Sequence, residues 1–290
     1  MVSLEELSAL DLQIWLRNGQ YAAGAARCNQ STICRRVERT LKGFGLSLAR
    51  RGGEWTLYGN PLLLTMEREI HQLARFLGQE PLRLEVSPLM APLVAEPIPR
   101  GWLLGRNDAI GMVCPLRLLR QRVIDAWLID NTMDLPPRED AEIARFDLGR
   151  YPLGLAASPD HPLVGERGVS FDDLRRFPVP QLPPELFPNT SGHLADLAFG
   201  GPLQLLRRYD PADWEGRTAD GASLTYATPF NLAQHPDLRR IDSVPLLING
   251  VSLVVRRDRI EMAPILALKQ LLEARLRQLA PKLQDLEPQP

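Results

Sequence analysis

The sequence has few of the residues that build disulfide scaffolds, metal centres and membrane spans. Its 290 residues include three cysteines, Cys28, Cys34 and Cys114, with no CxxC spacing, which excludes a disulfide framework and favours a reduced compartment. The four histidines do not pair with cysteines or carboxylates at the spacing of metal ligands. No run approaches 18 apolar residues, so we expect no membrane span.

An excess of charge of one sign is missing as well. The net charge of -1 predicts no bulk affinity for nucleic acid or anionic lipid, so any such binding must come from local clustering. The N-terminus carries acidic residues where a signal peptide carries positive charge, so we expect a cytoplasmic protein. GxGxxG, GxxxxGK[ST] and GxSxG motifs are absent, and no nucleophile, metal or cofactor constellation stands out. We therefore expect no enzyme, no catalytic residue, no metal and no cofactor.

Positive charge is concentrated near the N-terminus. Between residues 17 and 59, eight arginine and lysine residues are opposed by only two glutamates. The rest of the chain is acidic overall, because the whole chain is nearly neutral. This asymmetry indicates a separate N-terminal module with an anionic partner.

Three short helices are expected in this module. Leu7, Leu10 and Ile14 have helical spacing, and Asn18-Gly19 is a plausible end for the first helix. An alanine-rich second helix is expected over about residues 21–27. Two short helices joined by a tight turn, the later one basic near its start, are typical of a helix-turn-helix.

The third helix carries the polar and basic groups. Asn29 is a good N-cap, and Ile33, Val37 and Leu41 are spaced to face a core. The side chains that must then project elsewhere are Ser31, Thr32, Arg35, Arg36 and Arg39. A solvated, salt-bridged face is the alternative to a DNA-binding surface for such a charge run.

A hairpin follows this helix. Residues 46–59, LSLARRGGEWTLYG, are expected to form a strand, a Gly-Gly turn and a second strand, with Arg50 and Arg51 beside the tip. Hairpin wings of this kind contact phosphates or the minor groove, where arginine is favoured. The coincidence of the polar cap, the apolar spacing and the hairpin favours DNA binding over a solvated face.

These segments resemble the DNA-binding domain of the LysR-type transcriptional regulators. Residues 29–35, Asn-Gln-Ser-Thr-Ile-Cys-Arg, align without a gap with the family's Ser-Gln-(Pro/Ser)-(Ala/Thr)-Val-Ser-Arg motif, and Ala22-Ala23 match its Ala-Ala pair. The turn before Ala22 is about two residues shorter and the wing about one. We expect base contacts from Ser31, Thr32 and Arg35, and contacts to phosphates or flanking bases from Gln30 and Arg36. Arg50 and Arg51 are expected to anchor the wing, and Arg39 is a further candidate DNA-binding residue.

A helix with one narrow apolar seam follows the hairpin. Within residues 61–78 the apolar side chains recur in steps of three and four, at Leu63, Met66, Ile70, Leu73 and Leu77. The intervening side chains are polar: Glu67, Arg68, Glu69, Gln72 and Arg75. Such a helix needs a partner helix, either within the monomer or in a second copy. The family resemblance favours an antiparallel dimer through residues 62–77 and assembly into a tetramer.

Beyond residue 80, strand-like and helical segments alternate, in the order of an open α/β domain with a parallel sheet. YPLGLAASPDHPLVGERGVSFDDLRRFPVP and VPLLINGVSLVVRRDRIEMAPILALKQLLEARLRQL resemble the family's later segments. The resemblance implies an α/β fold with a winged helix-turn-helix at 1–59, a linker helix at 60–79 and a two-lobed, periplasmic-binding-protein-like effector domain at 80–290. Lobe I would take about 80–152 and 243–280, and lobe II about 153–242.

Effector contacts are expected at strand ends and helix starts, as the family resemblance implies. The residues in these places are Ser87, Asn131, Thr132, Thr190, Ser191 and Thr228. Hydroxyl and amide groups suit a half-closed cleft because they donate or accept without bringing a charge. For each of them, a helix-cap or turn role is the alternative.

We therefore expect a cytoplasmic, sequence-specific regulator of transcription that binds double-stranded DNA and responds to a small-molecule effector. The alternative is a solute-binding or protein-interaction module whose altered helix-turn-helix no longer binds DNA. An enzyme on the same fold is the least favoured hypothesis.

Overall fold

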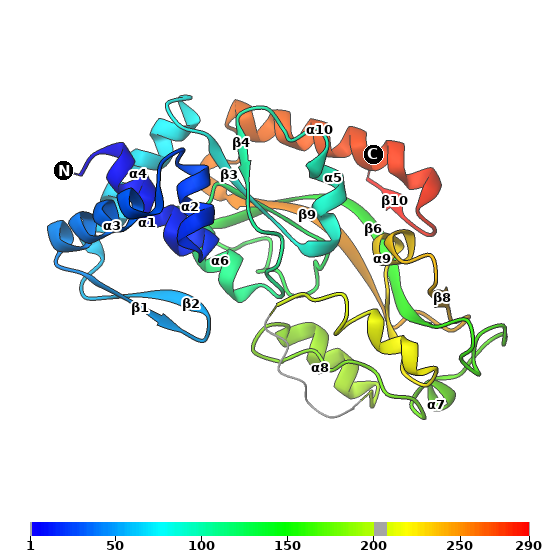
Figure 1. Cartoon of the computed structure of the whole chain (residues 1–290). Coiled ribbons are helices and arrows are strands. Elements are labelled where there is room, and N and C mark those ends of the chain that lie inside the picture. The colour runs from blue at the N-terminus through cyan, green and yellow to red at the C-terminus, as the bar shows by residue number, and fades with distance from the viewer. Residues whose placement is uncertain (1, 200–207, 290) are drawn as a thin grey trace. The chain divides into compact units, whose positions relative to one another are not determined.

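Three helices and a β-hairpin form the N-terminal head, which we define as residues 2–59 (Figure 1). The computed structural model describes residues 2–199 and 208–289. The helices are α1 (Leu4–Leu16), α2 (Gly19–Ala25) and α3 (Gln30–Phe44). Asn29 caps α3 as predicted, since its Oδ1 accepts the backbone N–H of Thr32 at 2.8 Å. Asn18, by contrast, does not end α1: Arg17 adopts the left-handed C-cap conformation, and Asn18 caps α2.

The apolar spacing of α3 is confirmed for two of its three positions. Ile33 and Val37 are buried, but Leu41 is only partly buried and Thr40 is fully buried. Steps of four residues overshoot the 3.6-residue turn, so the buried stripe moves from Val37 to Thr40. The Thr40 hydroxyl is satisfied by the carbonyl oxygens of Glu6 at 3.0 Å and Arg36 at 2.9 Å.

The hairpin pairs β1 (Ser47–Arg51) with β2 (Glu54–Tyr58) in antiparallel register, with Arg51 opposite Glu54. Gly52 and Gly53 close it with φ values of 57° and 87°. Both values lie in the region that favours glycine and that the tight two-residue hairpin turns require. The predicted wing is therefore present.

The chain forms two compact units. Besides the head, the first unit contains α4 (Leu62–Phe76), most of β3 (Leu82–Val86) and all of β4 (Trp102–Leu104). It also contains the separate segment 115–127. Strands β3 and β4 pair in parallel, with Leu82 opposite Trp102. Helix α6 (Val113–Arg120) and strand β5 (Ala126–Ile129) follow, and the boundary between the units falls inside β5.

The second unit contains residues 86–97, 107–114 and the described residues from 128 onward. After the turn η1 (Pro88–Met90) and α5 (Ala91–Ala95), its long strands β6 (Ile143–Ala157) and β9 (Leu247–Arg256) pair antiparallel. Strands β7 (Thr225–Ala227), β8 (Arg239–Arg240) and β10 (Glu287–Pro288) are also antiparallel to β6. The expected parallel pairing is confirmed between β3 and β4, whereas the strands around β6 are antiparallel.

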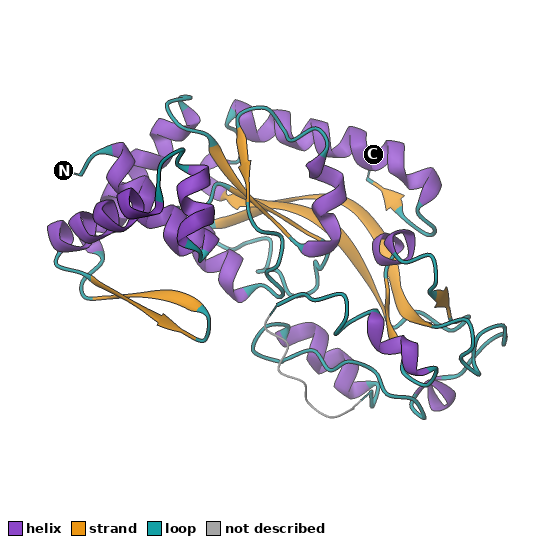
Figure 2. Cartoon of the chain, in the orientation of Figure 1, coloured by secondary structure: helices purple, strands orange, loops and turns teal. Residues whose placement is uncertain are grey.

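Helices complete the second unit (Figure 2). They are α7 (Phe171–Leu174), α8 (Pro188–Asp196), α9 (Pro229–Gln234) and α10 (Ala263–Leu279). Helix α10 buries Ile265, Leu268, Leu272 and Leu276, and a second apolar core gathers around β6, α7 and β7. The domain boundaries expected at residues 59, 79, 152 and 242 stay predictions.

Candidate nucleic-acid interface and effector site

The start of α3 presents the predicted base-contacting groups at the surface. Ser31 and Arg35 are exposed and Thr32 is half-buried. The hydroxyls of Ser31 and Thr32 both donate to Asn29 Oδ1 at 2.8 Å, and Arg35 Nη2 lies 3.4 Å from Thr32 Oγ1. These contacts fix the polar groups at the helix start without burying them.

Arg36 and Arg39 lie on a different side of α3. Arg36 donates to Glu5 of α1, and Arg39 Nη1 lies 3.5 Å from Glu6 Oε1. The Arg36 side chain is only 22% exposed, whereas that of Arg39 is 70% exposed. Both arginines therefore pair with α1, as in the salt-bridged face that stood as the alternative to a DNA-binding surface.

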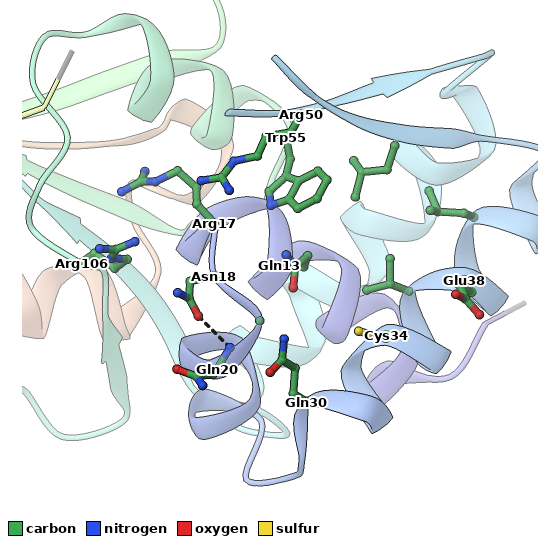
Figure 3. A pocket seen from close by; sticks show the side chains of 14 residues that line it. Gln13, Arg17, Asn18, Gln20, Gln30, Cys34, Glu38, Arg50, Trp55 and Arg106 are labelled. Carbon is green, nitrogen blue, oxygen red and sulfur yellow. Dashed lines mark hydrogen bonds between the residues drawn. The ribbon is translucent and has the colours of Figure 1, made fainter. Parts of the chain in front are cut away.

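A cavity of about 720 Å³ lies between α1, α2, α3 and the wing; we call it the head cavity (Figure 3). Among the predicted residues, Gln30 and Arg50 line it, and Arg51 does not. The Arg50 guanidinium lies 6.0 Å from the centre of the Trp55 ring. Sequence reasoning missed most of its other polar lining residues, which are Gln13, Arg17, Asn18, Gln20, Cys34, Glu38 and Arg106.

The composition of the head cavity suits a phosphate backbone. Three guanidinium groups, from Arg17, Arg50 and Arg106, line it against one carboxylate, Glu38. Amide side chains from α1, α2 and α3 add neutral donors (Figure 3). Guanidinium and amide groups make the contacts to phosphate oxygens that fix a protein on duplex DNA.

The predicted effector residues in the second unit gather around two aspartates and an asparagine that sequence reasoning did not select. The hydroxyl of Ser87 donates to Asp130 Oδ1 at 2.5 Å, and the hydroxyl of Tyr151 donates to the carbonyl oxygen of Asp130. The backbone N–H of Thr132 donates to Asn249 Oδ1 at 2.8 Å. The signal for Asp130 is its position, because it directly follows the buried strand β5.

Asp134 joins two further predicted residues. Asn131 Nδ2 donates to Asp134 Oδ2 at 2.8 Å, and the Thr190 hydroxyl donates to the same oxygen at 2.5 Å. The other oxygen accepts the backbone N–H groups of Asn189 at 2.7 Å and Thr190 at 3.1 Å. The carboxylate of Asp134 therefore satisfies the first turn of α8 from a distant segment of the chain.

Ser191 and Thr228 are placed apart from these contacts. Ser191 lines a smaller cavity of about 140 Å³ with residues 179–182, Pro184 and Tyr226. Thr228 forms a capping box with Asn231 at the start of α9 and is buried. The structure thus gives Thr228 the helix-cap role that stood as its alternative.

Asp130 gives a pH-dependent prediction. Burial raises the pKa of its carboxyl group, although the Ser87 hydroxyl opposes the rise. The folded protein therefore retains this proton at pH values where the unfolded chain has lost it, so stability falls as the pH rises from the ordinary pKa through the folded one. Asp130→Asn mimics the protonated form and should remove this loss.

Thermal unfolding between pH 4 and pH 8 checks this expectation. The difference in Tm between Asp130→Asn and wild type should grow in favour of the variant as the pH rises. The variant Asp160→Asn, at an exposed position, supplies the baseline. A difference for Asp130→Asn that stays constant over this range would contradict the assignment.

Within residues 2–199 and 208–289, no group of His, Cys, Asp and Glu is placed to hold a metal ion. Over the same part of the chain, no helix combines the length and the apolar character required to cross a membrane.

Comparison with solved structures finds the same fold in regulators of transcription. A full-length variant of OxyR from Pseudomonas aeruginosa has a TM-score of 0.57 at 15% identity, over 94% of this chain and 98% of that chain. The regulatory domain of MetR from N. meningitidis, a LysR family regulator, has a TM-score of 0.54 at 13% identity, over 73% and 100%. Full-length CbnR in complex with its target DNA has a TM-score of 0.50 at 16% identity, over 94% and 99%.

No protein-family model and no curated protein matches the sequence. The structural likeness nevertheless extends over nearly the whole chain. The protein has the fold of the full-length LysR-type regulators: a winged helix-turn-helix, a linker helix and a two-lobed α/β domain.

Proposed function

We propose that the protein is a cytoplasmic transcriptional regulator of LysR type, which binds specific DNA through the head and a small-molecule effector through the second unit. The observation that carries the proposal is the head cavity, where the start of α3 and a wing arginine line one basic concave surface. The fold supports it, since CbnR of the same fold was crystallised with its target DNA.

In this proposal the head residues divide into two groups. Ser31, Thr32 and Arg35 contact base edges in the major groove, because they are presented at the start of α3. Gln30, Arg50 and Arg51 contact the phosphate backbone. Arg36 and Arg39 act mainly by holding α3 on α1, through Glu5 and Glu6.

The effector site is proposed around Asp130 and Asp134. Ser87, Asn131, Thr132 and Thr190 surround these carboxylates, and their polar groups already have protein partners. An effector that binds there must therefore exchange hydrogen bonds with these residues, which is how its binding would alter the protein. The proposed role of the second unit is regulatory and not catalytic.

The first experiment is binding to labelled DNA from the upstream region of the protein's own gene, at several salt concentrations, against a scrambled duplex. We expect the native duplex to bind more tightly, with log affinity falling by roughly 5 or more per log unit of salt. Equal binding to both duplexes calls for a library of random duplexes. Failure to enrich any sequence from that library would refute the proposal.

Arg35→Ala tests base contact separately from phosphate contact. We expect it to weaken specific binding by about 1–3 kcal/mol and to leave binding to scrambled DNA nearly unchanged. Arg50→Gln should instead weaken specific binding and binding to scrambled DNA to a similar extent, and it should lower the salt slope by about 1. Arg150→Gln, at an exposed position on β6, is the control. If Arg35→Ala leaves specific binding intact, the assignment of α3 to the major groove is wrong.

A further inference from the structure

One cation of the head cavity comes from outside the winged helix-turn-helix. Arg106 follows β4, which pairs in parallel with β3. The backbone N–H of Gly105 donates to the carbonyl oxygen of Leu84 at 2.9 Å, which continues this pairing up to Arg106. In sequence, Arg106 lies 47 residues beyond the end of the head.

The β3–β4 edge is attached to α1 by a close contact. Glu85, the neighbour of Leu84 on β3, accepts a hydrogen bond from Trp15 Nε1 of α1, and both residues are buried. A Cβ added at Gly105 would lie 2.5 Å from Glu85 Oε2, so a larger residue there would have to displace this buried carboxylate. Trp15, Glu85 and Gly105 therefore fix the backbone immediately before Arg106 against the head.

A buried set of ion pairs strengthens this attachment. Arg83 of β3 donates to Asp11 Oδ2 at 3.4 Å and to the hydroxyl of Ser8 at 2.9 Å, both on α1. Arg68 of α4 donates to the other oxygen of Asp11 at 2.9 Å. Asp11, Arg68 and Arg83 are each less than 5% exposed. Such pairs have one favourable geometry, since any displacement leaves a buried charge unpaired.

Arg106 is placed over the helix-turn-helix as a result. Its guanidinium carbon lies 4.8 Å from the centre of the Tyr21 ring on α2, and its side chain lines the head cavity together with Arg50 and Gln30 (Figure 3). The N–H groups of a guanidinium that lies over a ring face point outward in the plane of the guanidinium, where phosphate oxygens can accept them.

We propose that Arg106 is an additional contact to the DNA backbone, supplied by the β3–β4 edge and not by the winged helix-turn-helix. This inference rests on the proposed function. The DNA-binding surface is then composite: the wing supplies Arg50, and the end of β4 supplies Arg106. Because the backbone before Arg106 is fixed to α1 and its guanidinium lies over Tyr21, the side chain is in place before DNA binds, and binding costs little further ordering.

The test compares two arginines of the same segment. Arg106→Gln and Arg100→Gln each remove one positive charge from an exposed position, but Arg100 does not line the head cavity. We expect Arg106→Gln to lower the salt slope of DNA binding by about 1. It should also weaken binding to the native and to the scrambled duplex by a similar factor. Arg100→Gln should match wild type, and the double variant Arg50→Gln/Arg106→Gln should lose about 2 from the slope.

The outcomes separate this inference from the proposed function. If Arg50→Gln lowers the slope but Arg106→Gln behaves like wild type, the contact from β4 is refuted and the DNA-binding function stands. If Arg100→Gln lowers the slope as much as Arg106→Gln, the effect is one of general charge, and the specific contact is likewise refuted. If wild type shows no salt-dependent binding to any duplex, the proposed function fails and this inference fails with it.

Discussion

Replacing Asp125 with alanine is expected to lower the free energy of unfolding by about 3–5 kcal/mol, because it leaves a buried guanidinium without its partner. Asp125 is fully buried and accepts hydrogen bonds from Arg75 Nε at 2.8 Å and Nη2 at 2.9 Å. It also accepts hydrogen bonds from Gln72 Nε2 at 3.1 Å and from the backbone N–H of Arg83 at 2.9 Å. One carboxylate therefore joins α4 to β3.

The titration of the two arginines supports this account. Burial alone would lower the pKa of Arg75, but the charge and hydrogen bonds of Asp125, together with the charges of Asp11 and Glu80, outweigh it, and the pKa is raised. Burial, with the nearby charge of Arg75, lowers the pKa of Arg83 to about 10. Both groups remain protonated at neutral pH, so removing Asp125 takes away the main compensation for the desolvation of Arg75.

Urea unfolding of three proteins checks the expected loss. The wild type and Asp125→Ala are compared with Asp172→Ala, which breaks the exposed pair between Asp172 and Arg175. An exposed pair contributes about 0–1 kcal/mol, so Asp172→Ala should unfold near the wild-type midpoint. Equal losses in the two variants would mean that the buried pair contributes no more than a surface pair.

The head could be predicted from the sequence because its signals are local. Asn29 lies next to the helix that it caps, and Gly52-Gly53 lies within the turn that it forms. Ile33 and Val37 show their common face through spacing alone. Each of these features involves residues only a few positions apart, so one sequence is enough to recognise them.

The polar face of the linker helix was predicted only in part. Arg68, Gln72 and Arg75 were expected to be polar side chains between the apolar positions, and the structure buries all three. The partner of Arg68 lies 57 residues away, at Asp11, and the partner of Arg75 lies 50 residues away, at Asp125. Local spacing contains no sign of such pairs, because a charge that will be buried by a distant partner looks like a solvated one.

The same reason limits the effector site and the head cavity. Ser87 and Asn131 were selected because each follows a predicted strand. The carboxylates that accept their hydrogen bonds could be identified only in the folded chain. Arg106 gave no signal at all, since its neighbour in the cavity, Arg50, is 56 residues earlier in the chain.

The apolar face of α4 gives the second large expected effect, on self-association. Six apolar side chains of this segment are 43–68% exposed: Leu62, Leu63, Met66, Ile70, Leu73 and Leu77. The opposite face is held within the chain, through Arg68 and Arg75. An exposed apolar stripe of this length with heptad-like spacing is typical of a helix that pairs with a second helix. We therefore expect a homodimer through residues 62–77.

Ile70→Glu should raise the Kd of this dimer at least 100-fold, which corresponds to about 2.7 kcal/mol. A symmetric seam contains the substitution twice, so two buried isoleucines are lost and two carboxylates are placed in an apolar contact. Sedimentation velocity over a range of protein concentrations measures the shift. Ile98→Glu, at a position that is 54% exposed and lies outside α4, is the matched control and should leave the dimer intact.

The two variants also connect assembly to DNA binding. A dimer sets two heads on two half-sites, so Ile70→Glu should weaken binding to a two-site duplex far more than binding to a single half-site. If Ile70→Glu sediments as the wild-type dimer does, the pairing surface lies elsewhere and α4 does not form it. If Ile98→Glu dissociates the dimer equally, the loss reflects added charge and not the α4 seam, because a contact specific to this helix must distinguish Ile70 from Ile98.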